Sequence, residues 1–281
     1  IASHYADIVF AVGPRSDHHE TAILQLARYN DIYFEEQFGT DGDGTAFELE
    51  LTHFVTSTMD GTPSGLKTTN AFDWYGTDLK NLGGEKESYR TNVLIKNHRD
   101  RDDYERMVEL AQAWSLSGSA LDAALAGLMD IDGWMRQYAM HSLIMNNDVY
   151  SSTSQGSAPH NIFFYVHPGT GEVMGLPWDM DSSFVRPTTD PLHGHMNLSK
   201  IIDRPVNTRI FYGHMLDLIE TTYNATYAGP IIDSLSALAN QSFSGRSSLI
   251  QQRANYVTGQ INARAPSVAF GITTADGLNV G

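Results

Sequence analysis

The sequence predicts an α+β fold, with a β-rich N-terminal part, 1–101, and a mainly helical C-terminal part, 102–281, that contains one small hairpin. Two observations support this prediction. Before Arg101, short apolar runs alternate with Gly, Asp and Thr, which is typical of strands joined by irregular loops. After Asp102, apolar residues recur at helical spacing. A chain of this length can bury a large core, either as one large domain or as two lobes that share a cleft.

The N-terminal strands are predicted where apolar residues cluster between turn-forming residues. These runs are Ile8–Val12, Phe47–Val55 and Val93–Ile95. The C-terminal helices are predicted from spacing alone. They are Tyr104–Trp114, Ala120–Met129, Ile131–Asn147, Arg209–Tyr223, Ile231–Ala239 and Ser247–Ala263. Ser117, Ser119 and Asp130 are suitable helix caps, and Gly-Pro and Ser-Gly pairs are expected to separate the last three helices.

The predicted hairpin carries polar residues at its ends. A tight turn at Pro168–Gly171 would fold two apolar strands back on each other. Asp148 precedes the first strand, Asn161 opens it, and Asp179 and Asp181 close the second strand. We therefore expect these four polar groups to meet at one end of the hairpin.

Composition narrows the classes of partner. The formal charge of −15 disfavours a generic nucleic-acid or anionic-membrane surface, because phosphates and acidic headgroups would be repelled. No run of about 18 apolar residues occurs, so no membrane span is expected. The chain has no cysteine, which excludes disulfides, zinc-thiolate sites and cysteine nucleophiles. It begins at Ile1 without an initiator Met, so we expect a processed or excised part of a longer product.

The order of the predicted parts is that of a protein-kinase-like fold. Phosphoryl transfer requires a carboxylate beside the attacking hydroxyl, and hard oxygen ligands for Mg²⁺ on the phosphates. Asp148 can supply the first, and Asn161, Asp179 and Asp181 the second. Asn161 follows Asp148 by 13 positions, a longer spacing than in ordinary protein kinases, and the strings H-R-D and D-F-G are absent.

Four strings carry a resemblance to a known family. They are Asp130–Arg136 (D-I-D-G-W-M-R), Asn147-Asp148, His160–Tyr165 (H-N-I-F-F-Y) and Leu176–Asp181 (L-P-W-D-M-D). In this order they resemble the spore-coat protein H (CotH) kinases, and the P-W-D-x-D string is the most specific of them. The resemblance covers roughly 89–184. It extends weakly to Lys96-Asn97 and the helix that follows them.

The resemblance implies a secreted or spore-associated atypical kinase with a two-lobed core. It would transfer the terminal phosphoryl group of ATP, with Mg²⁺ or Mn²⁺, to Ser or Thr of a protein acceptor or of a neighbouring coat or extracellular protein. By this resemblance Asp148 is the catalytic carboxylate and Asp179 the principal metal ligand. Asn161 and Asp181 would assist with the metal, and Lys96 and Asn161 would bind the nucleotide. Localisation would be extracellular, or on a spore or cell surface.

The chain also departs from the family pattern. Many members have a Gly-x-Leu-Tyr-Lys string where this chain has Gly44–Glu48, so an acidic residue replaces an expected basic one. Lys67, Lys86 and Lys96 are the candidates for a phosphate-binding lysine, and only Lys96 lies in a matching context. No glycine-rich nucleotide loop precedes Asn30, so the N-terminal lobe has diverged or is only partly present. The segment between Asp148 and His160 is an insertion rich in Ser, Gly and Gln.

Other polar clusters have simpler interpretations. A W-D-x-D string on its own would more often cap a helix or close a turn. His160 is expected to orient or pack rather than bind Mg²⁺. The clusters Asp17–Glu20 and His193–His195, with His214, could hold a transition metal but lack the H-E-x-x-H spacing. Thr40–Gly44 suggests calcium but lacks the remaining EF-hand ligands, so a surface turn is expected.

A second hypothesis is a structural or adhesive module that keeps the fold in a coat, sheath or extracellular assembly without catalysis. The set Asp148, Asn161, Asp179 and Asp181 favours the enzyme. Glu48 and the poorly matched N-terminal lobe favour the module.

Overall fold

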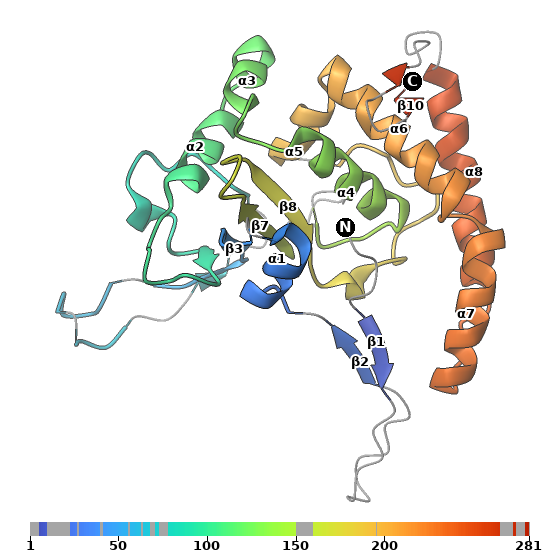
Figure 1. Ribbon diagram of the computed structural model, residues 1–281, viewed down its shortest axis with the longest axis horizontal. Helices are drawn as coiled ribbons and strands as arrows, with labels where there is room; N and C mark the ends of the chain where they lie inside the picture. The colour runs from blue at the N-terminus through green and yellow to red at the C-terminus, as the bar shows by residue number, and fades with distance from the viewer. Residues whose placement is uncertain are drawn as a thin grey trace, which may run out of the picture.

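The computed structural model (Figure 1) describes most of the chain. The described residues are 6–9, 23–26, 28–39, 42–55, 57–62, 64–67, 71–72, 78–149, 160–194, 196–264, 272–273 and 279–280. They contain helices and antiparallel sheet, so the predicted α+β class is confirmed. Within them, no helix combines the length and apolarity needed to cross a membrane.

A four-stranded antiparallel sheet forms the centre, in the order β6-β3-β7-β8. These strands are β6 (Val93–Ile95), β3 (Thr45–Leu49), β7 (Ile162–Val166) and β8 (Val173–Pro177). β3 and β6 come from the predicted N-terminal part, and β7 and β8 form the predicted hairpin. The sheet thus joins strands from both sides of residue 101, and a division into two lobes at that residue stays a prediction.

The two faces of the sheet are covered by different helices (Figure 1). α2 (Glu105–Trp114) and α4 (Ile131–Leu143) pack on one face, where Phe164 lies within 6.3 Å of the Trp114 ring and 5.6 Å of the Trp134 ring. α1 (Asp31–Phe38) covers the other face, where Phe34 stacks on Tyr165 at 4.1 Å. Burial of these large aromatic rings is the main stabilising contribution at the centre of the fold.

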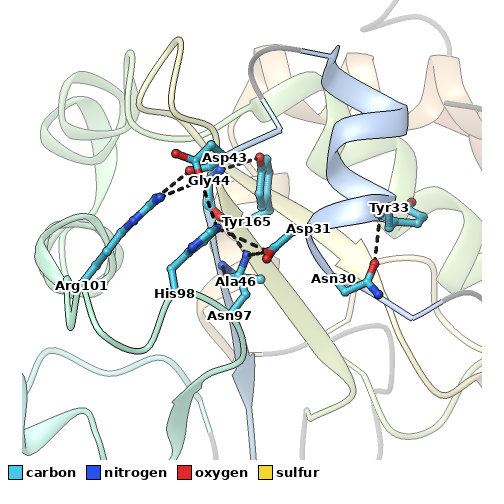
Figure 2. A network of polar contacts seen from close by, with 10 residues as sticks. All are labelled: Asn30, Asp31, Tyr33, Asp43, Gly44, Ala46, Asn97, His98, Arg101 and Tyr165. Atoms are coloured by element: carbon cyan, nitrogen blue, oxygen red, sulfur yellow. Dashed lines mark hydrogen bonds and ion pairs between the residues drawn. The ribbon is translucent and has the colours of Figure 1, made fainter.

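A network of polar contacts fixes α1 to the sheet (Figure 2). The side chain of Asn97 accepts from the N–H of Ala46 at 2.7 Å and donates to Asp31 at 3.1 Å and to the carbonyl of Gly44 at 3.0 Å. At Gly44 a Cβ would lie 2.2 Å from the carbonyl oxygen of Val166, so only glycine fits there. The turn before β3 is therefore held from both neighbouring strands.

The remaining described helices are α3 (Gly118–Leu125), which precedes α4, and four helices that follow the hairpin. These four are α5 (Met196–Ile202), α6 (Pro205–Thr221), α7 (Ala225–Ala239) and α8 (Arg246–Arg264). α6 packs along α4, with the ring of Phe211 5.7 Å from that of Tyr138. α7 and α8 run side by side at one end of the molecule (Figure 1).

Short elements complete the described structure. They are the strand pairs β1 (Ala6–Val9) with β2 (Ile23–Leu26), β4 (Thr52–His53) with β5 (Ala71–Phe72), and β9 (Ile272–Thr273) with β10 (Asn279–Val280), and the 3₁₀ turns η2 (Lys86–Ser88) and η3 (Met180–Ser182). The predicted run Ile8–Val12 lies partly outside the described residues. The predicted strand Phe47–Val55 is divided between β3 and β4.

Several predicted helix bounds differ from the observed ones: the helix expected over Ile131–Asn147 ends at Leu143, and the helix expected from Arg209 begins at Pro205. The largest difference concerns α7. The Gly-Pro pair before Ile231 was expected to separate two helices, but α7 continues through Pro230. Asn224 caps α7 by accepting from the N–H of Tyr227 at 2.9 Å, so the interruption falls before this cap instead. Pro230 has no N–H, and α7 therefore lacks one internal hydrogen bond at that position.

Candidate functional site

Asp148 lies on a short loop that follows α4. Met145 has φ of 52°, a left-handed conformation that ends the helical path. The side chain of the buried Asn146 then accepts from the N–H of Asp148 at 2.9 Å. The carbonyl of Asp148 accepts from the N–H of His160 at 3.0 Å, which joins this loop to the start of β7. The half-buried Asp148 is therefore held from both sides through its backbone.

Asp179 and Asp181 lie on a second loop, after β8. Asp179 has φ of 45° and Phe184 has φ of 63°, conformations that non-glycine residues rarely adopt. Such backbone strain costs roughly 1–3 kcal/mol per residue and is concentrated at functional sites. Both carboxylates are exposed, whereas the loop between Met180 and Phe184 is half-buried apart from Asp181. The strained turn presents the two acidic side chains to solvent.

Four hydrogen bonds join the two loops, and one of them runs from the side-chain amide of Asn146 to the sulfur of Met180 at 3.5 Å. The N–H of Asn147 donates to the carbonyl of Ser182 at 3.1 Å, and the N–H of Phe184 donates to the carbonyl of Ile144 at 2.7 Å. The hydroxyl of Ser182 donates to the carboxylate of Asp148. The structure thus brings Asp148 against the loop that carries Asp181, as expected from the position of these residues at the ends of the hairpin strands.

Asn161 connects the same region to the sheet. It is buried, has φ of 59°, and opens β7. Its side-chain amide lies 3.5 Å from the carbonyl oxygen of Asp179, at the limit of a hydrogen bond. Asn161 therefore lies between the β8 end that bears Asp179 and the β7 start that bears His160.

Lys96 forms an ion pair with Glu48, the residue that stands at the expected basic position. Glu48 is buried on β3 and is opposite Phe163 of β7 in the sheet register. The ammonium of Lys96 lies 5.7 Å from the centre of the Phe163 ring. Because Phe163 follows Asn161 by two residues, the Lys96–Glu48 pair lies near the start of β7.

Burial raises the pKa of the nearby Glu50 carboxyl, and the charge of Glu48 raises it further. His160 and Lys96 act in the opposite direction on the same pKa. The strand ends of β3, β6 and β7 therefore bring two carboxylates and two basic groups together beside Asn161.

Aromatic side chains adjoin this charged group. The ring of Tyr29 lies 5.1 Å from that of Phe163 and 5.7 Å from that of Trp178, and the hydroxyl of Tyr29 donates to the carbonyl of Pro177. Trp178, of the P-W-D-x-D string, is half-buried and directly precedes Asp179. A planar apolar surface thus lies beside the two acidic residues.

The donor set suits a hard cation. Within the described ranges, no three His, Asp or Glu side chains converge into a group that could hold a metal ion by themselves. Asp179, Asp181 and the amide oxygen of Asn161 are oxygen donors, which Mg²⁺ and Mn²⁺ prefer. Mg²⁺ is usually held by one or two carboxylates with water and phosphate completing its shell, so these residues fit it.

The other candidates for metal or phosphate binding lie away from the two joined loops or outside the described residues. His193 contacts Asp203 at 2.6 Å and Tyr212 at 2.9 Å, and His214 contacts Asp132 at 2.9 Å. Asp17–Glu20, His195 and Thr40-Asp41 lie outside the described residues. Asp43 is exposed and pairs with Arg101 at 2.6 Å. Lys86 pairs with Asp102 at 2.8 Å, and Lys67 is exposed in an isolated bridge with Thr58.

Sequence reasoning missed several residues at this site. Ser182 and Asn146 position Asp148, yet short polar residues in loops carry no distinguishing pattern. Arg253 of α8 was also missed. It is fully buried and donates to the carbonyls of Ser142 at 2.9 Å, Thr188 at 3.0 Å and Asp190 at 2.5 Å. Arg253 lies on the apolar face of α8 with Ile250 and Val257, and this spacing is the sequence signal that could have indicated its burial, although arginine is rarely fully buried.

Comparison with known families gives a clear result. The chain matches the family model described as CotH kinase protein over residues 53–264. No curated protein matches it. The match covers strands β6, β7 and β8 of the sheet, the two joined loops and the helices α2 to α8, and it begins after β3. The chain therefore belongs to the CotH kinase protein family.

Proposed function

We propose that this chain is an atypical kinase that transfers the terminal phosphoryl group of ATP to a Ser or Thr hydroxyl of a protein, with Mg²⁺ or Mn²⁺. The kinase-like character of the chain follows from its family membership. The observation that carries the proposal of phosphoryl transfer is the hydrogen bond from Ser182 to Asp148, because it couples the candidate base to the loop bearing Asp179 and Asp181.

Asp148 is the group proposed to act on the acceptor. Its carboxylate already accepts a hydrogen bond from one hydroxyl, that of Ser182, so it can accept another from a Ser or Thr of the acceptor. A carboxylate placed there orients the attacking oxygen and takes its proton as the bond to phosphorus forms. The backbone bonds to Asn146 and His160 hold Asp148 in place for this role.

Asp179, Asp181 and Asn161 are proposed to hold the metal. When bound, the divalent cation neutralises phosphate charge that builds up during transfer. The exposed carboxylates of Asp179 and Asp181 leave room for nucleotide phosphates to complete the coordination shell. Asn161 keeps the Asp179 loop close to the sheet through its contact with the carbonyl of Asp179.

Lys96 is proposed to contact the phosphates, with Glu48 holding it in place. Protein kinases use a lysine of this kind paired to a glutamate. Here the pair joins β3 to the end of β6, so the acidic residue at position 48 need not remove the basic function. The half-buried ring of Trp178 offers an apolar surface beside this group for the nucleobase.

Transfer from radiolabelled ATP to protein acceptors tests the proposal. Purified chain is incubated with Mg²⁺ or Mn²⁺ and Ser-rich or Thr-rich acceptors, and incorporated label is followed with time. We expect incorporation that requires the metal and is abolished by Asp179→Ala. Absence of label with either metal, together with absence of nucleotide binding, would reject the proposal.

One observation favours the alternative, a non-catalytic module of a coat, sheath or extracellular assembly. Lys96 is engaged by Glu48, so its charge is partly neutralised before any phosphate arrives. Thermal unfolding separates the two functions, because a ligand that binds only the folded state raises the melting temperature. A shift with Mg²⁺-ATP supports the kinase, and an unchanged melting temperature supports the module.

A further inference from the structure

A largely apolar groove of about 570 Å³ lies between the loop that carries Asp179 and Asp181 and helix α7. The loop contributes Met180, Asp181, Ser183 and Phe184 to its lining. The helical wall comes from α7, α8 and the segment between them. A volume of this size accommodates a few side chains rather than a folded domain.

The α7 wall of the groove is unusually exposed. No residue of α7 is fully buried, although the helix is rich in apolar side chains. Tyr227 is 52% exposed and Ile231 is 46% exposed, and both line the groove. Contiguous exposed apolar surface of this kind marks an interaction site more often than an isolated exposed residue does.

Arg246 gives the groove a charge preference. It is exposed, lines the groove, and its guanidinium lies 5.6 Å from the centre of the Phe184 ring. No carboxylate among the residues that the structure describes pairs with it, whereas Arg90, Arg186 and Arg204 each have one. In a chain with a formal charge of −15, this cation is available for an acidic group of a partner.

We propose that the groove docks a segment of the acceptor protein, with apolar side chains against Tyr227 and Ile231 and an adjacent Asp or Glu on Arg246. This inference rests on the proposed kinase function and adds the substrate class. Ser183 lines the groove and follows Ser182, whose hydroxyl contacts Asp148, so a docked segment lies directly beside the candidate base. The apolar lining does not suit a triphosphate, which requires polar donors.

Direct peptide binding tests the docking without requiring catalysis. The probe is a fluorescein-labelled peptide of sequence Gly-Gly-Leu-Asp-Leu-Gly-Ser-Gly, measured by fluorescence anisotropy. Two comparison peptides replace both Leu by Gly, or Asp by Lys. We expect the Leu-to-Gly peptide to bind about tenfold more weakly and the Asp-to-Lys peptide about threefold more weakly. Equal affinity for all three peptides overturns the proposal.

Protein variants locate the site of binding. Ile231→Asp should abolish the preference for Leu. The matched control Leu238→Asp, on the same helix and 45% exposed but outside the groove, should leave it unchanged. Arg246→Glu should reverse the charge preference, so that the Lys peptide binds better than the Asp peptide. Equal effects of the two Asp variants, or an unchanged charge preference in Arg246→Glu, overturn the assignment.

Two further measurements keep the outcomes distinct. Circular dichroism and thermal melts of each variant establish that it is folded. Sedimentation velocity of wild type and Ile231→Asp tests a second copy as occupant, and a dimer that dissociates in the variant overturns docking of an acceptor. Because anisotropy needs neither ATP nor transfer, groove-specific binding without phosphorylation rejects the proposed kinase function alone. Phosphorylation without groove-specific binding rejects the docking alone.

Discussion

At the scale of single residues, the candidate acidic groups differ in their surroundings. Asp148 is half-buried and accepts a hydrogen bond from Ser182, whereas Asp179 and Asp181 are exposed on a strained turn. A held carboxylate suits the orientation of one hydroxyl. Exposed carboxylates suit a cation that shares its shell with phosphate and water. The surroundings therefore support different roles for the two loops.

This difference predicts separable effects of mutation. Asp148→Ala should lower turnover by about 10²- to 10⁴-fold while ATP affinity stays nearly unchanged, because a base acts chiefly in the transition state. Asp179→Ala should weaken both turnover and Mg²⁺-ATP binding. Radiolabel transfer reports turnover, and calorimetry reports affinity. Loss of ATP binding in Asp148→Ala would argue that this residue holds metal or nucleotide instead.

His141 of α4 predicts a pH dependence of stability. It is buried, its Nδ1 has no hydrogen-bond partner within the described part of the chain, and burial lowers its pKa to about 3. In the unfolded chain histidine titrates near pH 6.5, so between pH 6.5 and 3 the unfolded state binds the additional proton. Stability should therefore fall as pH decreases below about 6.5, by up to about 1.4 kcal/mol per pH unit from this group.

Urea unfolding of His141→Leu at pH 7.5, 6.5, 5.5 and 5.0 measures this contribution. The difference in unfolding free energy between variant and wild type should move in favour of the variant as pH falls. Comparing differences removes the carboxylate titrations that both proteins share. A difference that stays constant over this range would mean that His141 has the same pKa in the folded and the unfolded protein.

At the scale of elements, long segments with a strong periodic pattern were predicted from the sequence, and short helices were not. α2, α4 and the β7–β8 hairpin follow long periodic runs or a clear turn, and they begin at or next to the predicted residues, although α4 ends at Leu143 and not at Asn147. α1 and α5 are short, and their stability comes from tertiary contacts such as Phe34 on Tyr165. α7 shows the converse case, because its packing against α8 tolerates a proline that local rules treat as a break.

The candidate site also contains some features that the sequence predicts and others that it does not. The hairpin allowed Asp148, Asn161, Asp179 and Asp181 to be placed at one end from sequence, since strand reversal alone brings them close. The contact of Lys96 with Glu48 and the burial of Arg253 depend on packing between segments far apart in the chain. The partners of Lys96 and of Arg253 are not encoded in a local pattern. Only the fold shows which polar groups support the candidate residues.

Arg253 is predicted to hold both loop regions to α8. It donates to Ser142, near the end of α4, and to Thr188 and Asp190, which follow the Asp179 loop. Burial lowers its pKa, although the charge of Asp190 acts in the opposite direction, so the cation is retained at a cost. Arg253→Met should lower the unfolding free energy by about 2–4 kcal/mol, since buried carbonyls lose their donors.

Hydrogen exchange locates the effect of this substitution. We expect faster exchange in Arg253→Met at the N–H of Asp190 and in the loop that precedes it, with the β3–β7 pairing unaffected at the same temperature. Arg209→Met is a suitable control, because Arg209 is half-buried on α6 and, among the residues that the structure describes, its guanidinium donates only to the carbonyl of Pro205. A uniform increase across the chain would indicate global destabilisation and no local role.

At the scale of the whole molecule, one sheet carries residues from both parts of the chain into the site. β3 and β6 bring Glu48 and Lys96, while β7 and β8 bring Asn161 and Asp179. Movement between the two parts would therefore strain the backbone pairing of β3 with β7. Ligands that contact both pairs of strands should stabilise the entire fold, not only one region of it.

This arrangement predicts that metal and nucleotide stabilise the protein synergistically. No described group of His, Asp and Glu can hold a metal alone, so Mg²⁺ by itself should raise the melting temperature little. ATP with excess EDTA should also do little, since its charge faces Asp179 and Asp181. Together they should raise the melting temperature by more than the sum of the separate shifts, because each completes the site of the other.

Asp179→Ala should lose the synergy, whereas Asp233→Ala, which removes an equal charge from the exposed side of α7, should keep it. Additive shifts in the wild-type protein would show that metal and nucleotide do not share a site.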